Sequence, residues 1–297
     1  MIPGAATSPE SHARTDPANR EARAGHHGKD EMRRVTSKDG TSIAYELSGV
    51  GQPVILVGGS LDDGSENGPL ASALAEHFAV YNYARRGRGE SDSTPPPYDV
   101  AREIADLDAL IAEAGGSAHI YGVSTGGALA LEAAAAGCSI EKMGVYEVPY
   151  NATDQDWPRQ WREYAEGVTA ALALGRRGDA VELFMRVTGS SDTDLAQLRV
   201  SPYWPELEAV AHTLAYDAAA LGDGQPPTAR LALITQPTLV VTGDDRPPGA
   251  AKWVTALDDA ADAIAARVVH AERETLRGQG HVADPEAVVP LLTRFFA

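Results

Sequence analysis

The residues with the clearest chemical potential form the pentapeptide Gly122-Val123-Ser124-Thr125-Gly126. An apolar strand pattern at 119–121 precedes it, and a run of good helix formers at 125–136 follows it at once. A serine on a sharp turn between strand and helix projects its hydroxyl from the sheet, and glycines let the turn close. The N–H groups at the helix N-terminus can stabilise a nearby oxyanion. The pattern predicts Ser124 as a covalent nucleophile; a purely structural turn of small residues is the less favoured alternative.

The elements around this turn alternate between strand and helix. A turn signal at Asp39-Gly40 predicts a hairpin near the start, and later apolar runs are typical of strands buried on both faces. The expected strands are 33–35, 41–47, 54–57, 79–83, 119–121, 143–146, 238–241 and 267–269. Helices are expected at 69–78, 100–114, 125–136, 250–264 and 288–296. This order predicts an α/β fold with a mostly parallel, doubly wound sheet.

One long segment, 150–235, interrupts the alternation with helical patterns alone. Its apolar stripes are Trp161, Tyr164, Ala165 and Val168, and then Leu207, Val210, Ala211 and Leu214. Because the segment is too long for a loop, we expect a helical cap inserted over the sheet, with residues 31–149 and 236–297 as the core. Residues 1–30 are rich in Ala, Pro, Gly, Glu and Arg and lack an apolar centre, which predicts a disordered arm.

Composition narrows the class of partner. The net charge is −17, from 25 basic and 42 acidic residues, and this argues against nucleic-acid binding. No apolar stretch is long enough to span a membrane. The single cysteine, Cys138, makes no internal disulfide and permits a reducing compartment. We therefore expect a cytoplasmic protein with a small-molecule substrate and without nucleic-acid or membrane partners.

Three motifs give residues 35–296 a resemblance to the α/β-hydrolase superfamily: the pentapeptide around Ser124, the segment 83–91, and Gly278-Gln279-Gly280-His281. The second is similar to the family's Arg-Gly-x-Gly-x-Ser loop, whose usual role is structural. No catalytic part is therefore given to its arginines, Arg85, Arg86 and Arg88. The resemblance implies a capped, esterase-like member with a serine nucleophile and no need for a cofactor or metal.

The same resemblance implies an oxyanion hole made from two backbone N–H groups, those of Thr125 and Ser60. Ser60 closes the segment Gly58-Gly59-Ser60, where relatives often have His-Gly. Glycine at 58 removes a side chain that normally braces this loop. A backbone donor can survive that change, so we still expect the Ser60 N–H to contribute to the oxyanion hole.

The general base is expected at His281, where relatives carry theirs, after the last strand and before the terminal helix. Its imidazole would take the proton of Ser124 and return it to the leaving group. His270, at the expected end of the last strand, is the nearest rival. His212 falls on the apolar stripe of a cap helix, where a packed or rim position is the default.

The third member of the triad departs from the family pattern. Relatives place an aspartate three residues after the glycine that ends the strand following the cap, but here that residue is Arg246. Asp245 and Asp244 lie one and two residues earlier. Glu147, directly after the strand 143–146, is another candidate, because some relatives take the acid from that strand end. We favour Glu147 over Asp245, with Asp244 third.

A serine nucleophile with a histidine base implies acyl transfer. The expected reaction is cleavage of a small or medium carboxylic ester, or of a lactone or thioester, through an acyl-enzyme. Five aromatic residues of the cap either line an acyl pocket or pack the cap core: Trp157, Trp161, Phe184, Tyr203 and Trp204. The alternatives are carbon–carbon bond hydrolysis or perhydrolysis at the same triad, a cyclase or thioesterase acting on a carrier-bound chain, and a non-catalytic binding protein.

Overall fold

The computed structural model describes residues 32–246 and 252–297. The segment 1–30, expected to be a disordered arm, lies outside the described residues. The described residues all belong to one compact unit, and the description below concerns this unit alone.

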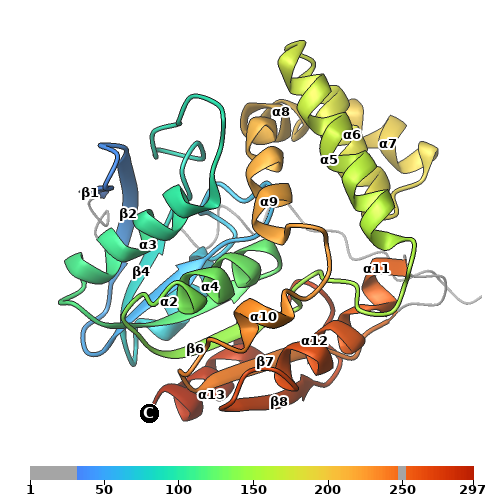
Figure 1. Ribbon diagram of the computed structural model, residues 1–297. Coiled ribbons are helices and arrows are strands. Elements are labelled where there is room, and N and C mark those ends of the chain that lie inside the picture. Colours follow the sequence, from blue (N-terminus) through green and yellow to red (C-terminus); the bar gives the residue numbers. More distant parts are fainter. Residues whose placement is uncertain (1–31, 247–251) are drawn as a thin grey trace, which may run out of the picture. The chain divides into compact units, whose positions relative to one another are not determined.

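The centre of the unit is a mostly parallel sheet (Figure 1). Its eight strands in the described residues follow the order β1-β2-β4-β3-β5-β6-β7-β8. Pairing is antiparallel between β1 and β2 and between β2 and β4, and parallel from β4 through β8. The strands are β1 (Arg33–Thr36), β2 (Ser42–Ser48), β3 (Pro53–Val57), β4 (Ala79–Tyr83), β5 (Ala118–Val123), β6 (Ile140–Tyr146), β7 (Thr238–Gly243) and β8 (Ala271–Leu276).

Helices cover both faces of this sheet, which gives the doubly wound α/β fold expected from the sequence. They are α2 (Gly68–Leu74), α3 (Val100–Glu113), α4 (Thr125–Ala135), α11 (Lys252–Thr255), α12 (Leu257–Ala265) and α13 (Pro285–Phe296). Strand β3 illustrates the two layers, because Ile55 and Val57 join the core beneath α3, α4 and α12, whereas Val54 and Leu56 join the core beneath α2 and α13. A strand buried on both faces must be apolar throughout, as this one is.

A helical insertion separates β6 from β7. Its helices are α5 (Trp157–Ala173), α6 (Arg177–Val187), α7 (Asp192–Arg199), α8 (Trp204–Val210), the 3-10 helix η1 (Ala211–Thr213), α9 (Leu214–Leu221) and α10 (Thr228–Leu231). Figure 1 shows α5 to α9 standing above the sheet, and α10 packs against α4. The apolar stripe from 207 to 214, expected on one helix, is divided among α8, η1 and the first residue of α9.

The expected last strand at 267–269 is wrong. Those residues form the turn after α12, where Val268 packs into the core and Val269 is exposed. The strand is β8, whose sequence Ala-Glu-Arg-Glu-Thr-Leu carries charged side chains. β8 lies at the edge of the sheet and pairs only with β7 in the described residues. An edge strand is partly solvated, so charges are tolerated there and the apolar signal is lost.

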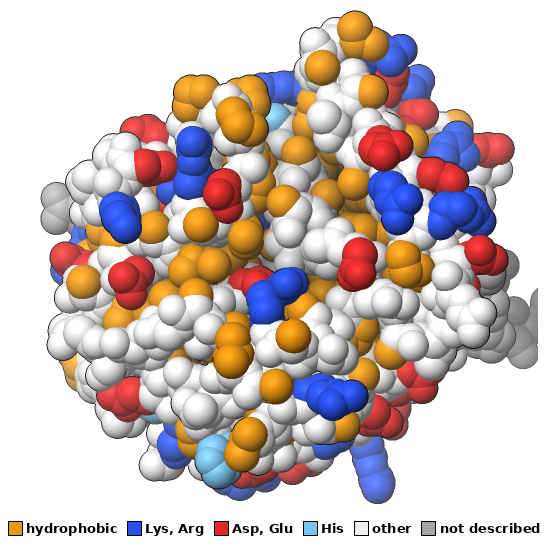
Figure 2. Space-filling model, viewed as in Figure 1, with side chains coloured by type: hydrophobic (Ala, Val, Ile, Leu, Met, Phe, Trp, Pro, Cys, Tyr) orange, Lys and Arg blue, Asp and Glu red, His pale blue; other side chains and the backbone are white. Residues whose placement is uncertain are grey.

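The surface drawn in Figure 2 carries acidic and basic side chains that are interspersed rather than segregated. Hydrophobic side chains are visible between the insertion and the rest of the molecule in the same view. Within the described ranges, no helix is both long and apolar enough to cross a membrane.

Candidate active site

Ser124 occupies a strained turn between β5 and α4. Its backbone has φ 55° and ψ −126°, a conformation that non-glycine residues rarely adopt. The Ser124 N–H donates to the carbonyl of Tyr146 at 2.9 Å, which fixes the turn against the end of β6. The residues two positions before and after the serine are glycines because a side chain there would clash with the backbone. A Cβ at Gly126 would lie 2.3 Å from the carbonyl oxygen of Val57, and a Cβ at Gly122 would lie 2.6 Å from the carbonyl oxygen of Gly126.

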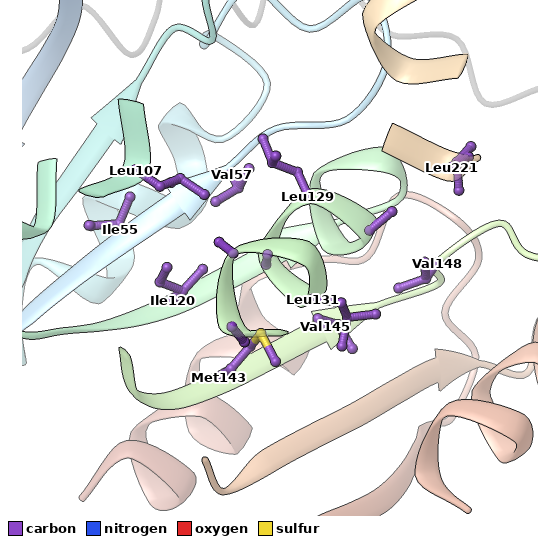
Figure 3. Close-up of a cluster of buried hydrophobic side chains, with 14 of the residues drawn as sticks. Ile55, Val57, Leu107, Ile120, Leu129, Leu131, Met143, Val145, Val148 and Leu221 are labelled. Atoms are coloured by element: carbon purple, nitrogen blue, oxygen red, sulfur yellow. The ribbon is translucent and has the colours of Figure 1, made fainter. Parts of the chain in front are cut away.

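The hydrophobic core holds this turn in place from below. Leu129 and Leu131 of α4 are buried in the same cluster as Ile120 of β5 and Val145 of β6, and Figure 3 shows these side chains gathered between helix and sheet. Close packing of this kind resists displacement, because interior side chains interdigitate with few voids. The strain at Ser124 is therefore opposed by the surrounding core.

His281 lies in the loop between β8 and α13 and meets Glu147 from the end of β6. The His281 Nδ1 and Glu147 Oε2 atoms are 2.8 Å apart. The Trp253 ring packs nearly perpendicular to the imidazole, with the two ring centroids 4.8 Å apart. The loop is further tied down by the Tyr146 hydroxyl, which donates to the Gly280 carbonyl at 2.5 Å. The imidazole is thus held by a carboxylate, an aromatic ring and a fixed backbone.

Glu147 is almost fully buried and is held as a carboxylate. Burial favours the neutral acid, but His281, the Gly243 N–H at 2.9 Å and Arg246 outweigh it, so the pKa of Glu147 lies below its ordinary value. Arg246 Nη2 lies 2.8 Å from Glu147 Oε1. An ionised carboxylate only accepts hydrogen bonds, so Nδ1 of His281 carries the hydrogen and its Nε2 is left as the proton acceptor. Arg246, at the family's usual acid position, is thus an ion-pair partner of Glu147.

The other candidate acids are placed elsewhere. Asp244 and Asp245 are exposed, and in the described part of the chain neither makes a hydrogen bond or ion pair with His281. Asp244 Oδ1 accepts from the Gly278 N–H at 2.5 Å, so it shapes the loop before the histidine. Asp245 contributes its backbone N–H, which donates to the Gln279 carbonyl at 2.9 Å.

The rival histidines lie outside the cavity that holds Ser124. His270 is exposed in the turn before β8, one residue ahead of that strand rather than at its end. His212 is half-buried in η1, where its ring packs edge-on against Tyr216. Burial lowers the pKa of His212, and Arg177 adds to the effect, so it stays neutral at physiological pH.

Ser124 and His281 line one cavity of about 420 Å³. Its apolar wall comes from both the core and the insertion, and includes Trp157, Trp161 and Phe184 of the insertion and Trp253 of α11. Two of the five aromatic residues weighed from the sequence lie elsewhere: Tyr203 is largely exposed and Trp204 borders a separate surface hollow. Among the described residues that line the cavity, none is a lysine or arginine.

Ser60 and Thr125, the residues expected to supply the oxyanion hole, lie side by side on the same cavity. Their hydroxyl oxygens are 3.2 Å apart. The missing side chain at Gly58 has a physical reason, because a Cβ there would lie 1.9 Å from Oδ2 of Asp62. Buried Asp62 thus occupies the space that a larger residue would need.

Sequence reasoning missed three residues that shape the site: Arg246, Trp253 and Asp217. Arg246 was treated only as a substitution that removes the usual acid. Asp217, on α9, lines the cavity with a buried carboxylate and contacts Thr125. An acidic residue between apolar neighbours on a cap helix was the available signal, and it is the same kind of signal that pointed to Glu147.

Comparisons with known proteins agree with this architecture. The model of the alpha/beta hydrolase family matches residues 54–291. A solved structure of an α/β-hydrolase from Sphaerobacter thermophilus shares 44% identity at a TM-score of 0.77, with 89% of this chain and 100% of that one covered. A search of curated proteins found no significant match.

More distant structures share the fold. An esterase from Thermogutta terrifontis has 20% identity and a TM-score of 0.66, over 90% of this chain and 98% of that one. An enol-lactonase from Burkholderia xenovorans has 21% identity and a TM-score of 0.64, over 89% of this chain and 99% of that one. With the family match spanning most of the sequence, this chain is a hydrolase enzyme that belongs to the alpha/beta hydrolase family.

Proposed function

We propose that this protein is a serine hydrolase that cleaves a small or medium carboxylic ester through an acyl-enzyme. Ser124 is the nucleophile, His281 the base and Glu147 the acid that orients the base. The observation that carries the proposal is the 2.8 Å contact between Glu147 and His281, at a cavity that also exposes the strained Ser124. Asp245 and Asp244 are not proposed as the acid, because the carboxylate that contacts His281 in the described residues is Glu147.

The proposed reaction follows from this arrangement. Ser124 Oγ attacks the ester carbonyl carbon while His281 Nε2 takes its proton, and Glu147 stabilises the resulting imidazolium. The N–H groups of Ser60 and Thr125 stabilise the oxyanion of the tetrahedral intermediate. Collapse breaks the bond to the alcohol oxygen, which leaves with the proton from His281. Water then repeats the sequence on the acyl-enzyme and releases the acid.

The cavity supports an uncharged substrate of modest size. Its volume of about 420 Å³ lies at the small end of the range of ligand pockets. Apolar rings dominate its wall, and the charged residues among its described lining other than His281 are the acidic Asp62, Glu66 and Asp217. A carboxylate on the acyl group would find no cationic partner among these lining residues. We therefore propose neutral acyl chains as the preferred substrates.

We further propose that the insertion, residues 150–235, acts as a cap over a core of 31–149 and 236–297. Trp161 supports this role, because it lines the cavity from α5 and is fixed there by a hydrogen bond of 3.1 Å from its indole N–H to the Gly222 carbonyl. A cap of this kind excludes water from the acyl-enzyme and sets the length of acyl chain that fits.

A series of p-nitrophenyl esters with acyl chains of increasing length tests both proposals. We expect turnover by the wild type and labelling by a fluorophosphonate probe, with both lost in Ser124→Ala and retained in the exposed-serine control Ser72→Ala. Trp161→Ala should shift the preference to longer chains, whereas Trp204→Ala, outside the cavity, should leave it unchanged. Labelling that persists in Ser124→Ala would contradict the assignment of the nucleophile.

A further inference from the structure

We propose that Arg88 is a positioning residue of the oxyanion hole and that Asp217, carried by α9 of the insertion, holds Arg88 in place. This inference rests on the proposed function, because it concerns the N–H groups that would receive the oxyanion. The loop 83–91 was expected to be purely structural. Two of its arginines, Arg85 and Arg88, instead donate to carbonyl oxygens of the loop that carries Ser60.

Arg88 controls the direction of the Ser60 N–H through the peptide bond that precedes it. The Arg88 Nη1 donates to the Gly59 carbonyl oxygen. That carbonyl and the Ser60 N–H belong to one planar peptide unit, in which they point in opposite directions. Holding the oxygen on the protein side therefore aims the N–H away from the arginine. Arg85 acts on the preceding peptide unit in the same way, with its Nη1 3.3 Å from the Gly58 carbonyl oxygen.

Asp217 connects this arginine to both proposed oxyanion donors. Its Oδ1 accepts from Arg88 Nη2 at 2.8 Å, from Arg85 Nη1 at 2.8 Å and from the Thr125 hydroxyl at 3.1 Å. The Ser60 hydroxyl oxygen lies 3.2 Å from that of Thr125, so the two hydroxyls lie together beside Asp217. One carboxylate from the insertion thus ties the two halves of the oxyanion hole together.

Burial makes this arrangement rigid. Arg85, Arg88 and Asp217 are 2%, 1% and 2% exposed. Burial opposes ionisation of Asp217, but Arg88 and Arg85 outweigh it and keep its pKa below the ordinary value. A fourth buried group, Glu103, pairs with Arg85 at 2.7 and 2.9 Å, so two cations face two carboxylates. Buried charges that are paired cannot separate without a large desolvation cost. The cluster therefore supplies the bracing that the family's loop histidine, replaced here by Gly58, would give.

The test compares Arg88→Met with the matched control Arg86→Met. Arg86 is an equally buried arginine of the same loop, but its partners are Asp106 and Asp39 rather than the oxyanion loop. For Arg88→Met we expect kcat to fall by about 100-fold, the effect of losing one oxyanion donor, with KM changed by less than about threefold. The Ki of a trifluoromethyl ketone, whose adduct places an oxyanion in the hole, should rise by a similar factor.

Activities are corrected for the folded fraction measured by circular dichroism, so a loss of stability alone does not imitate the effect. Arg88→Lys, which keeps a cation and one donor, should recover part of kcat, and Asp217→Asn should lower kcat and raise Ki by about tenfold. If Arg88→Met does not fold, kcat and Ki of these two variants test the inference instead. The inference is overturned if the Ki of the ketone is unchanged in all three, or if Arg86→Met raises it equally.

Failure of the underlying function has a different signature. A wild type that neither turns over esters nor reacts with a fluorophosphonate overturns both proposals. A wild type that does both, with Arg88 and Asp217 variants whose ketone Ki matches its own, overturns only the role of this cluster.

Discussion

Replacing Glu147 with glutamine removes one charge from the site and alters little of its shape. The buried carboxylate accepts from His281 and the Gly243 N–H and pairs with Arg246, all at 2.8 to 2.9 Å. A glutamine amide has one accepting oxygen and one donating NH2 group, so in either orientation a donor faces a donor. The imidazolium formed in the transition state also loses its counter-charge. We expect kcat to fall by about 1000-fold, which corresponds to about 4 kcal/mol of transition-state stabilisation.

Steady-state kinetics on p-nitrophenyl butyrate, with protein that circular dichroism shows to be folded, measures this loss. Asp245→Asn and Asp244→Asn are the matched controls. Each should keep kcat within about twofold of the wild type, since both side chains are exposed and asparagine keeps the oxygen that accepts from the Gly278 N–H. The assignment of Glu147 as the acid is refuted if its glutamine variant keeps kcat within tenfold of the wild type. A large loss in Asp245→Asn with a small one in Glu147→Gln would transfer the role to Asp245.

Three further predictions concern stability. Ser124→Gly relieves the positive φ, so its free energy of unfolding should exceed that of Ser124→Ala by about 1 kcal/mol in urea titrations; an equal or lower value would argue against backbone strain at Ser124. Gly126→Ala forces a Cβ against the Val57 carbonyl and should cost about 2 kcal/mol in the same titrations, and a neutral result would contradict the close approach. Arg246→Met should raise the pKa of Glu147, because it removes a cation beside the carboxylate. A carboxyl group whose pKa is lowered in the folded state stabilises the fold above its unfolded pKa of 4.5. The fold loses this stabilisation as the pH falls through the folded pKa. Unfolding titrations should therefore show Arg246→Met less stable than the wild type near pH 7, with the gap closing towards pH 3, and a gap that widens on acidification would refute it.

The fold was accessible from the sequence because most of its signals are local. Central strands such as β3 are buried on both faces, so their residues are apolar without interruption. The edge strand β8 gave no such signal and was misplaced by a few residues, because its position depends on pairing with β7 rather than on its own composition. The turn at Ser124 was equally local, since a strand, two glycines and a helix lie within a short stretch of chain.

The site needed the tertiary structure wherever distant segments meet. The sequence named three possible acids and favoured Glu147 over Asp245 and Asp244 without excluding either aspartate. Pairing of β6 with β7 sets Glu147 beside Gly243, so its carboxylate faces the loop of His281 while the two aspartates turn outward. No pattern in the sequence joins Arg88 to Asp217, which lies in the insertion far along the chain. Local composition therefore determined the turn at Ser124, the proposed nucleophile, and the central strands around it. The partners of buried charges were decided by the register of the sheet and the docking of the insertion, because the energy of such charges depends on neighbours brought together only by folding.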